Sequence, residues 1–260
     1  MLAIGDELLS GRTRDINVHR LGGWLTERAV ALKEARIVTD DIALIASALN
    51  DLRARYDYVF TSGGIGPTHD DLTVDGVAAA FGVDVVENSA ALARIEAWYR
   101  GLGEEVTPAR RRMARMPGGA ILIDNPVSGA PGVRLGNVYV MAGVPRIFAA
   151  MLDAVATEIE PGIRIHSRAV TARGLPESAI ADRLRAIQAA GGAGVAIGSY
   201  PIDGDRKGVT IIARSASPAD AESAIDAVRS AMRDLGVEPV DGDHAALRGM
   251  TTSDEAGEAR

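Results

Sequence analysis

Three glycines and two adjacent aspartates stand close together, directly after a short apolar run. The residues of this segment that could bind a ligand or do chemistry are Ser62, Gly63, Gly64, Gly66, Thr68, His69, Asp70, Asp71 and Thr73. Glycines after a strand let the backbone turn sharply and approach a ligand closely. A helix predicted over Val74–Phe81 would point its free N–H groups and the positive end of its dipole at the same place. The segment favours a phosphate or diphosphate ligand, although it is neither a Walker A loop nor a GxGxxG dinucleotide fingerprint.

The paired aspartates point to a metal ion. Carboxylates beside a phosphate site repel the ligand unless a divalent cation lies between them. Either Asp70 or Asp71 alone could instead cap the following helix, which stabilises a helix by about 1 kcal/mol. The pair, together with Thr68 and Thr73, favours metal-assisted phosphate binding. His69 could serve as a general base, but a single histidine beside a loop is more often a surface hydrogen-bonding residue.

A second acidic segment follows the first apolar run, Leu2–Ile4, and contains Asp6 and Glu7. Asp15 and Asn17 then stand at the start of a predicted helix, where Asp15 is a candidate N-cap. Parallel strands place their carboxyl ends at one edge of the sheet, so these residues are expected beside the glycine segment. Acidic groups facing a phosphate loop are the arrangement that metal-assisted phosphoryl chemistry uses.

Two further loops combine small residues with proline and could form rigid walls for a flat ligand. They are Asn125–Gly132, which contains Pro131, and Ala142–Pro145. Taken alone, each is simply a turn.

Short apolar runs alternate with helical patterns through residue 163. The expected strands are Leu2–Ile4, Ala35–Val38, Tyr58–Thr61, Ala120–Ile123 and Val138–Met141, and a long helix is expected from Pro145 to Ile159. This alternation implies right-handed crossovers and a three-layer α/β/α domain with a mostly parallel sheet. Glu160-Pro161-Gly162 marks a boundary.

A small α+β domain is expected over 164–240. Its predicted elements are the strands Ser167–Thr171, Val195–Tyr200 and Gly208–Ala213, the helices Glu177–Ala189 and Ala219–Leu235, and a turn at Ile202–Asp205. A G-x-x-G at Gly191 and Gly194 precedes a strand without nearby cations, which favours a plain loop over a nucleic-acid clamp. Residues 241–260 are polar and aperiodic, which predicts a disordered tail.

Composition narrows the function classes. The 260 residues contain no cysteine, which excludes thiolate metal sites and cysteine nucleophiles. The net charge is −7, so a nucleic-acid partner is not expected. The one dense basic run, Arg110–Arg112 with Arg115, is either a solvated helix face or a contact for an anionic ligand. No signal peptide and no membrane span are expected, which predicts a cytoplasmic location.

Several segments, in order along the chain, resemble the signature of the competence/damage-inducible protein A (CinA) family. They are Gly5–Leu9, Asp15 with Asn17, Ser62–Thr73, Ala130–Gly132 and Gly143–Pro145. The stretch Gly64–Asp71, with Asn125–Ser128, is similar to the N-terminal domain of eukaryotic FAD synthases. The resemblance covers residues 1–163 closely, and 165–236 is similar to the small domain that follows in CinA proteins. Many CinA proteins carry glutamine where Met113 stands.

The resemblance implies a molybdopterin-binding fold and a divalent-metal-dependent pyrophosphatase acting on ADP-ribose or FAD-like dinucleotides, in a dimer or trimer. It equally implies kinship with enzymes that adenylylate molybdopterin or insert molybdenum, and a non-catalytic nucleotide-binding module is a third alternative. The expected metal is Mg²⁺, Mn²⁺ or Co²⁺, with Asp6, Glu7, Asp70 and Asp71 as ligands, directly or through water, and Asp6, Asp70 and Asp71 as catalytic residues. The expected ligand contacts are Ser62, Gly63, Gly64, Gly66, Thr68, Thr73, Asn17, Pro131, Gly132 and Pro145.

Overall fold

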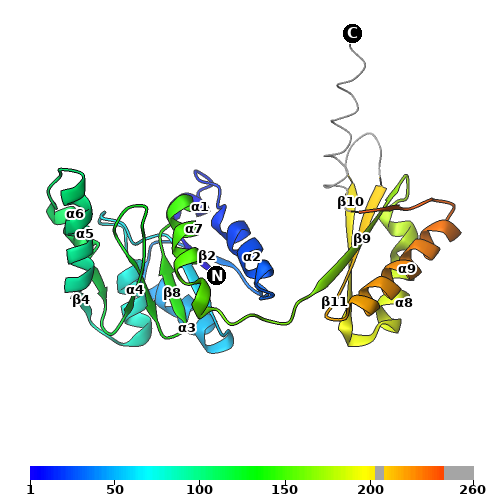
Figure 1. Cartoon of the computed structure of the whole chain (residues 1–260), viewed down its shortest axis with the longest axis horizontal. Helices are drawn as coiled ribbons and strands as arrows, with labels where there is room; N and C mark the ends of the chain where they lie inside the picture. Colours follow the sequence, from blue (N-terminus) through cyan, green and yellow to red (C-terminus); the bar gives the residue numbers. More distant parts are fainter. Residues whose placement is uncertain (203–207, 243–260) are drawn as a thin grey trace, which may run out of the picture. The chain divides into compact units, whose positions relative to one another are not determined.

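The computed structural model describes residues 1–202 and 208–242 (Figure 1). The chain divides into two compact units, Met1–Gly162 and Ile163–Arg260. The first unit thus ends one residue before the boundary expected at 163. Within the described ranges, no helix combines the length and the apolar character that crossing a membrane requires.

A six-stranded sheet forms the centre of the first unit. Its strands, in spatial order, are β2 (Arg36–Val38), β1 (Leu2–Ile4), β3 (Val59–Ser62), β8 (Val138–Met141), β7 (Gly132–Leu135) and β6 (Ile121–Ile123). The first four strands are parallel to one another, and β7 and β6 are antiparallel to their neighbours. The prediction of a mostly parallel sheet is therefore confirmed. Strand β7 was not predicted, because its first residues follow Pro131 in a segment that resembles a loop.

Helices cover both faces of this sheet. They are α1 (Asp6–Leu9), α2 (Asn17–Glu27), α3 (Ile42–Arg55), α4 (Thr73–Phe81), α5 (Ser89–Gly101), α6 (Pro108–Arg112) and α7 (Pro145–Ala154). A separate 3₁₀ turn, η1 (Ala156–Glu158), follows α7, so the long helix predicted to Ile159 is wrong. A 3₁₀ turn also returns side chains to one face about every third residue, so the apolar spacing does not separate it from a helix. A two-stranded sheet of β4 (Val85–Glu87) and β5 (Arg115–Pro117) was also not predicted.

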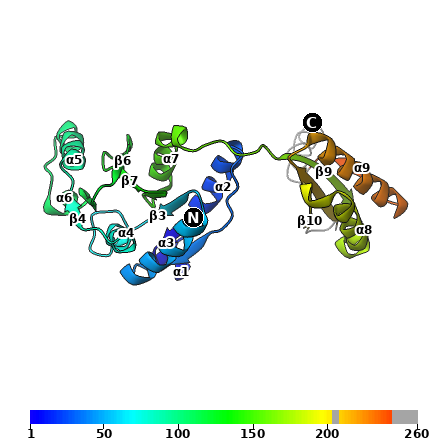
Figure 2. The same cartoon turned by 90° about the horizontal axis from the view of Figure 1, so that it is seen from below.

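Alternate residues of the central strands belong to different cores. Val59, Val138 and Val140 pack with residues of α3, α4 and α5 in one cluster. Phe60 and Tyr139, their neighbours in sequence, pack with residues of α2 and α7 in another cluster. Figure 2 shows α3 and α7 on opposite sides of β3. This period of two, with a helix layer on each face, confirms the three-layer prediction.

In its described residues, the second unit is a four-stranded antiparallel sheet with two α-helices. Its elements are β9 (His166–Arg173), α8 (Glu177–Ala190), η2 (Gly192–Gly194), β10 (Val195–Ile202), β11 (Gly208–Ser215), α9 (Pro218–Asp234) and β12 (Val240–Asp241), with strand order β10-β11-β9-β12. The small α+β domain is thus as predicted. The G-x-x-G segment forms η2, a turn that leads into β10. Residues 203–205 of the predicted turn lie outside the described residues.

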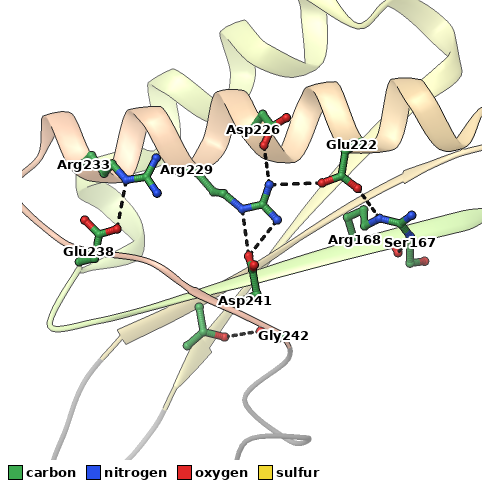
Figure 3. Close-up of polar contacts among 10 residues, drawn as sticks. Ser167, Arg168, Glu222, Asp226, Arg229, Arg233, Glu238, Asp241 and Gly242 are labelled. Atoms are coloured by element: carbon green, nitrogen blue, oxygen red, sulfur yellow. Dashed lines mark hydrogen bonds and ion pairs between the residues drawn. The ribbon is translucent and has the colours of Figure 1, made fainter.

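The tail predicted from residue 241 begins too early. Asp241 lies in β12, paired with β9, and its carboxylate accepts from the Arg229 side chain at 2.8 and 2.9 Å (Figure 3). The carbonyl of Gly242 accepts from the Thr171 hydroxyl at 2.9 Å. Composition alone could not show this, because the partners of these two residues lie on α9 and β9. Residues 243–260 lie outside the described residues.

Two truncations test whether Asp241 and Gly242 stabilise the second unit. Deleting residues 243–260 is expected to leave the melting temperature within a degree or two of the full-length value. Deleting 241–260 removes the Arg229 ion pair and the bond from Thr171, and is expected to cost about 1–2 kcal/mol more. Thermal and urea unfolding of both truncated chains measures the difference. Equal stabilities would show that β12 contributes nothing to the unit.

Candidate functional site

The carboxyl ends of β1, β3 and β8 meet around Gly63. A Cβ atom on Gly63 would lie 2.2 Å from the carbonyl oxygen of Ile4, the last residue of β1. A Cβ atom on Gly143, in the loop after β8, would lie 3.2 Å from the Gly63 Cα atom. The predicted edge of the sheet is therefore where these loops come together.

Asn17, in the first turn of α2, is buried and links the loops at this edge of the sheet by hydrogen bonds. Its side-chain amide donates to the Ser62 hydroxyl and to the Gly143 carbonyl, both at 2.8 Å. Asn17 and Ser62, both predicted as ligand contacts, are each 3% exposed. They hold the loops that surround the site. The N-cap of α2 is Ile16 and not Asp15 as predicted, but the Asp15 carboxylate accepts from the Val18 N–H in the first turn at 2.8 Å.

Replacing Asn17 with alanine tests this connecting role. The change removes two hydrogen bonds between elements and leaves the Ser62 hydroxyl in a buried place without its donor. We expect a loss of about 1–3 kcal/mol in the free energy of unfolding. Urea denaturation measures it, with Asn50→Ala on the exposed face of α3 as the matched control. The same small loss in both variants would contradict the role of Asn17.

The backbone of the glycine segment admits no larger residue at two positions. Gly63 and Gly64 have φ angles of 106° and 65°. A Cβ atom on Gly64 would lie 2.2 Å from Thr73 Oγ1. The Thr73 hydroxyl donates to the Gly63 carbonyl at 2.8 Å, and its N–H donates to the Gly64 carbonyl at 3.0 Å. Thr73, which was predicted as a ligand contact, is fully buried, and its two hydrogen bonds support the loop.

Asp71 folds back onto the same loop. One carboxylate oxygen accepts from the Gly66 N–H at 2.7 Å, and the other accepts from the N–H of Thr68 at 2.8 Å and from its hydroxyl. Helix α4 begins at Thr73 without a side-chain cap, so neither aspartate caps it as the alternative interpretation supposed. Both oxygens of Asp71 are engaged inside the loop, which is a poor arrangement for the metal ligand that was predicted.

Asp40 is a member of the site that sequence reasoning missed. It follows β2, and its carboxylate accepts from the Asp6 N–H at 3.0 Å, while the hydroxyl of neighbouring Thr39 donates to the Asp6 carboxylate. Burial raises the pKa of Asp40; the bond from the Asp6 N–H lowers it, and the charges of Asp6, Glu7 and Asp70 raise it further. The charges of Asp6, Glu7 and Asp70 therefore all act on the Asp40 carboxyl. Its position directly after a parallel strand was the sequence signal that could have identified Asp40 as part of the site.

Asp70 is open to solvent, with 68% of its side chain exposed. Hydrogen bonding from Thr68 and from the backbone, together with the charge of His69, holds the pKa of Asp70 below its usual value. His69 is almost fully exposed and lies 3.9 Å from the Asp70 carboxylate, as expected of a surface residue. Asp6 and Glu7 are likewise exposed at the start of α1.

The four acids predicted to hold a metal ion, directly or through water, are Asp6, Glu7, Asp70 and Asp71. In the part of the chain that the structure describes, no three or more His, Asp or Glu side chains gather to hold a metal ion. Asp6, Glu7 and Asp70 instead form an exposed acidic rim beside the glycine loop. Such a rim suits Mg²⁺, which keeps several waters and is usually bound by one or two carboxylates together with phosphate oxygens of the substrate.

A narrow crevice of about 20 Å³ lies beside the glycine loop. Its lining includes Gly66, Asp71, Arg112, Met113 and Pro131. Gly132, which was predicted as a ligand contact, is buried against β8, where a Cβ atom would lie 2.5 Å from the Val140 carbonyl oxygen, so glycine allows close strand packing. Pro145 begins α7, and its carbonyl accepts from the Arg20 side chain.

The loop before β7 is held by hydrogen bonds from its own residues. The buried Asn125 donates to the Ser128 hydroxyl at 2.7 Å and to the Ala130 carbonyl at 2.8 Å. A Cβ atom on Gly129 would lie 2.4 Å from Trp98 Cβ and Cγ, so the Trp98 side chain packs directly on this loop.

Family comparisons agree with this architecture. Residues 1–161 match the model described as "Probable molybdopterin binding domain", and residues 164–241 match "FAD synthase, middle domain". A protein of Caldivirga maquilingensis is 34% identical over 242 residues, which are 90% of this chain and 94% of that protein. A CinA-like protein of Citrifermentans bemidjiense is 39% identical over 191 residues, which are 71% of this chain and 46% of that protein.

A solved structure supports the same assignment. The protein CinA from Thermoplasma acidophilum, described as of unknown function, is 36% identical, with a TM-score of 0.56. The match covers 61% of this chain and 96% of that one. Together with the two family models, these relatives show that the chain belongs to the CinA family, with a molybdopterin-binding domain followed by an FAD synthase middle domain.

Proposed function

We propose that the first unit binds a nucleotide or pterin ligand by its phosphate or diphosphate and hydrolyses the diphosphate bond of ADP-ribose or FAD-like dinucleotides with a divalent cation. One observation carries this proposal. The loop at Gly63 and Gly64 is held with two positive φ angles by close packing against Ile4 and Thr73, and the exposed acids Asp6, Glu7 and Asp70 adjoin it. A loop that bound phosphate without a metal ion would have a higher affinity if those acids were absent, because unpaired carboxylates repel the ligand.

The residues of the chain have distinct parts in this proposal. Within residues 1–202 and 208–242, the N–H groups of Gly64 and Ile65 make no hydrogen bond to the protein, so they are free to donate to phosphate oxygens. Asp71 keeps the loop in shape by holding the N–H groups of Gly66 and Thr68. Asp6, Glu7 and Asp70 would hold a hydrated Mg²⁺, Mn²⁺ or Co²⁺ ion, which neutralises phosphate charge and activates water when bound.

Molybdopterin is the second candidate ligand, because residues 1–161 match a molybdopterin-binding model. The same loop would then hold the terminal phosphate of the pterin or its adenylylated form. A catalytically inert nucleotide-binding module is the remaining alternative.

A ligand panel separates these functions. We expect ADP-ribose or FAD with Mg²⁺, Mn²⁺ or Co²⁺ to raise the melting temperature by about 5–10 °C at a hundred times the Kd. AMP release should then follow the metal concentration. Stabilisation by a pterin phosphate without hydrolysis of any dinucleotide would favour the molybdopterin function. Binding of dinucleotides with no turnover under any metal would leave a binding module.

We also propose that the chain forms a dimer or trimer, as its family resemblance implies. Multi-angle light scattering at micromolar concentration should give two or three times the chain mass of 27.1 kDa. A mass of one chain would contradict it.

A further inference from the structure

The basic run of the sequence divides into two kinds of arginine. Arg110 pairs with Glu104, Arg111 forms two bonds of 2.7 Å with Glu87, and Arg115 bonds Asp75 at 2.7 Å. In the part of the chain that the structure describes, Arg112 has no carboxylate partner and no hydrogen bond from its guanidinium. It is half-buried in spite of this, whereas Arg111 is exposed.

Arg112 lies where an unpaired cation could reach a ligand bound at the glycine loop. Arg112 lines the crevice that also includes Gly66, Asp71 and Pro131. Gly66 and Asp71 are parts of the glycine loop itself. The guanidinium is therefore on the wall of the candidate site, reached from α6, while the acidic rim of Asp6, Glu7 and Asp70 approaches the loop from the ends of β1 and β3.

The negative charges around the glycine loop favour a cationic side chain beside a bound phosphate. Asp6, Glu7, Asp40 and Asp70 are all carboxylates, and a diphosphate adds further negative charge. A hydrated cation at the rim can neutralise part of it. On the crevice side the charged lining residues are Asp71, whose carboxylate is bonded to the loop amides, Arg115, which is paired with Asp75, and Arg112. A planar guanidinium matches phosphate oxygens with two parallel N–H bonds.

We propose that Arg112 binds a phosphate group of the ligand and makes the site selective for phosphorylated ligands over their nucleosides. This rests on the proposed phosphate-binding function of the same loop. The neighbouring Arg110 and Arg111 then have a different task, since their ion pairs fasten α6 to adjacent segments.

The test compares Arg112→Gln and Arg112→Lys with the matched control Arg111→Gln. Isothermal titration calorimetry measures the affinity for inorganic pyrophosphate, ADP-ribose and adenosine, at two salt concentrations. Arg112→Gln is expected to weaken pyrophosphate and ADP-ribose binding about 10- to 100-fold, with adenosine unaffected and a shallower salt dependence. Arg112→Lys should recover part of the loss, because it keeps the charge without the fork. The melting temperature of each Arg112 variant should equal that of the wild type.

Three results overturn the proposal. Unchanged pyrophosphate and ADP-ribose affinity in Arg112→Gln is one, and an equal loss in Arg111→Gln, which would reflect net charge only, is another. A wild type that binds no phosphate ligand overturns it together with the proposed function. Arg112-dependent binding without any dinucleotide hydrolysis supports the role of Arg112 and refutes the hydrolase alone.

Discussion

Under the proposed hydrolase function, replacing Asp70 with asparagine is expected to lower metal-dependent hydrolysis of ADP-ribose or FAD about a thousandfold, while the melting temperature stays within about 2 °C of the wild type. A thousandfold loss corresponds to about 4 kcal/mol of transition-state stabilisation, as expected for a charged group that holds a metal ion. Asp70 is largely exposed and caps no helix, so asparagine removes its charge without disturbing the fold.

Asp71→Asn is the informative companion. Asp71 accepts two backbone N–H groups and one hydroxyl, and asparagine has only one acceptor oxygen to replace its carboxylate. We expect this variant to lose activity together with about 1–3 kcal/mol of stability. AMP release across a metal titration, measured beside urea unfolding, distinguishes the two variants. Full activity in Asp70→Asn would show that Asp70 is not needed to bind the proposed metal ion, and would leave Asp6 and Glu7 as its candidate ligands.

Gly63→Ala is expected to destabilise the first unit by at least about 3 kcal/mol. The φ angle of 106° is strained for any residue with a Cβ atom, and the new methyl group would lie 2.2 Å from the Ile4 carbonyl oxygen. That oxygen belongs to a buried strand between two parallel neighbours, so it cannot retreat without disturbing β1.

Gly11→Ala is the control for strain alone. Gly11 also has a positive φ, 72°, but a Cβ atom there would meet no atom within 4 Å. It should cost about 1–2 kcal/mol, the usual penalty of a left-handed conformation. Urea denaturation of both variants separates strain from overlap. If the two costs are equal, the Ile4 carbonyl can move and the close approach of β1 to the loop is not a constraint.

Much of the architecture was predictable from local pattern. Alternating apolar runs and helical spacings indicated the sheet and its two helix layers, because burial on one face imposes a period of two on strands and 3.6 on helices. The glycines at Gly63 and Gly64 indicated a special backbone, and both have positive φ. Because parallel strands end at one edge of a sheet, Asp6 and Asn17 were predicted to lie near that loop. The close approach of Gly63 to Ile4 and the hydrogen bond from Asn17 to Ser62 agree with this prediction.

The role of each polar side chain was decided only by the tertiary structure. Asn17 and Gly143 are 126 residues apart in sequence, and Asp6 and Asp40 are 34 apart, so neither pair leaves a periodic signal. Arg111 and Arg112 are adjacent and chemically identical, yet one bonds Glu87 while the other lines the crevice. Residue type sets which bonds a side chain can make, but strand register and loop conformation determine which partner is within reach, and those depend on the packing of the whole unit.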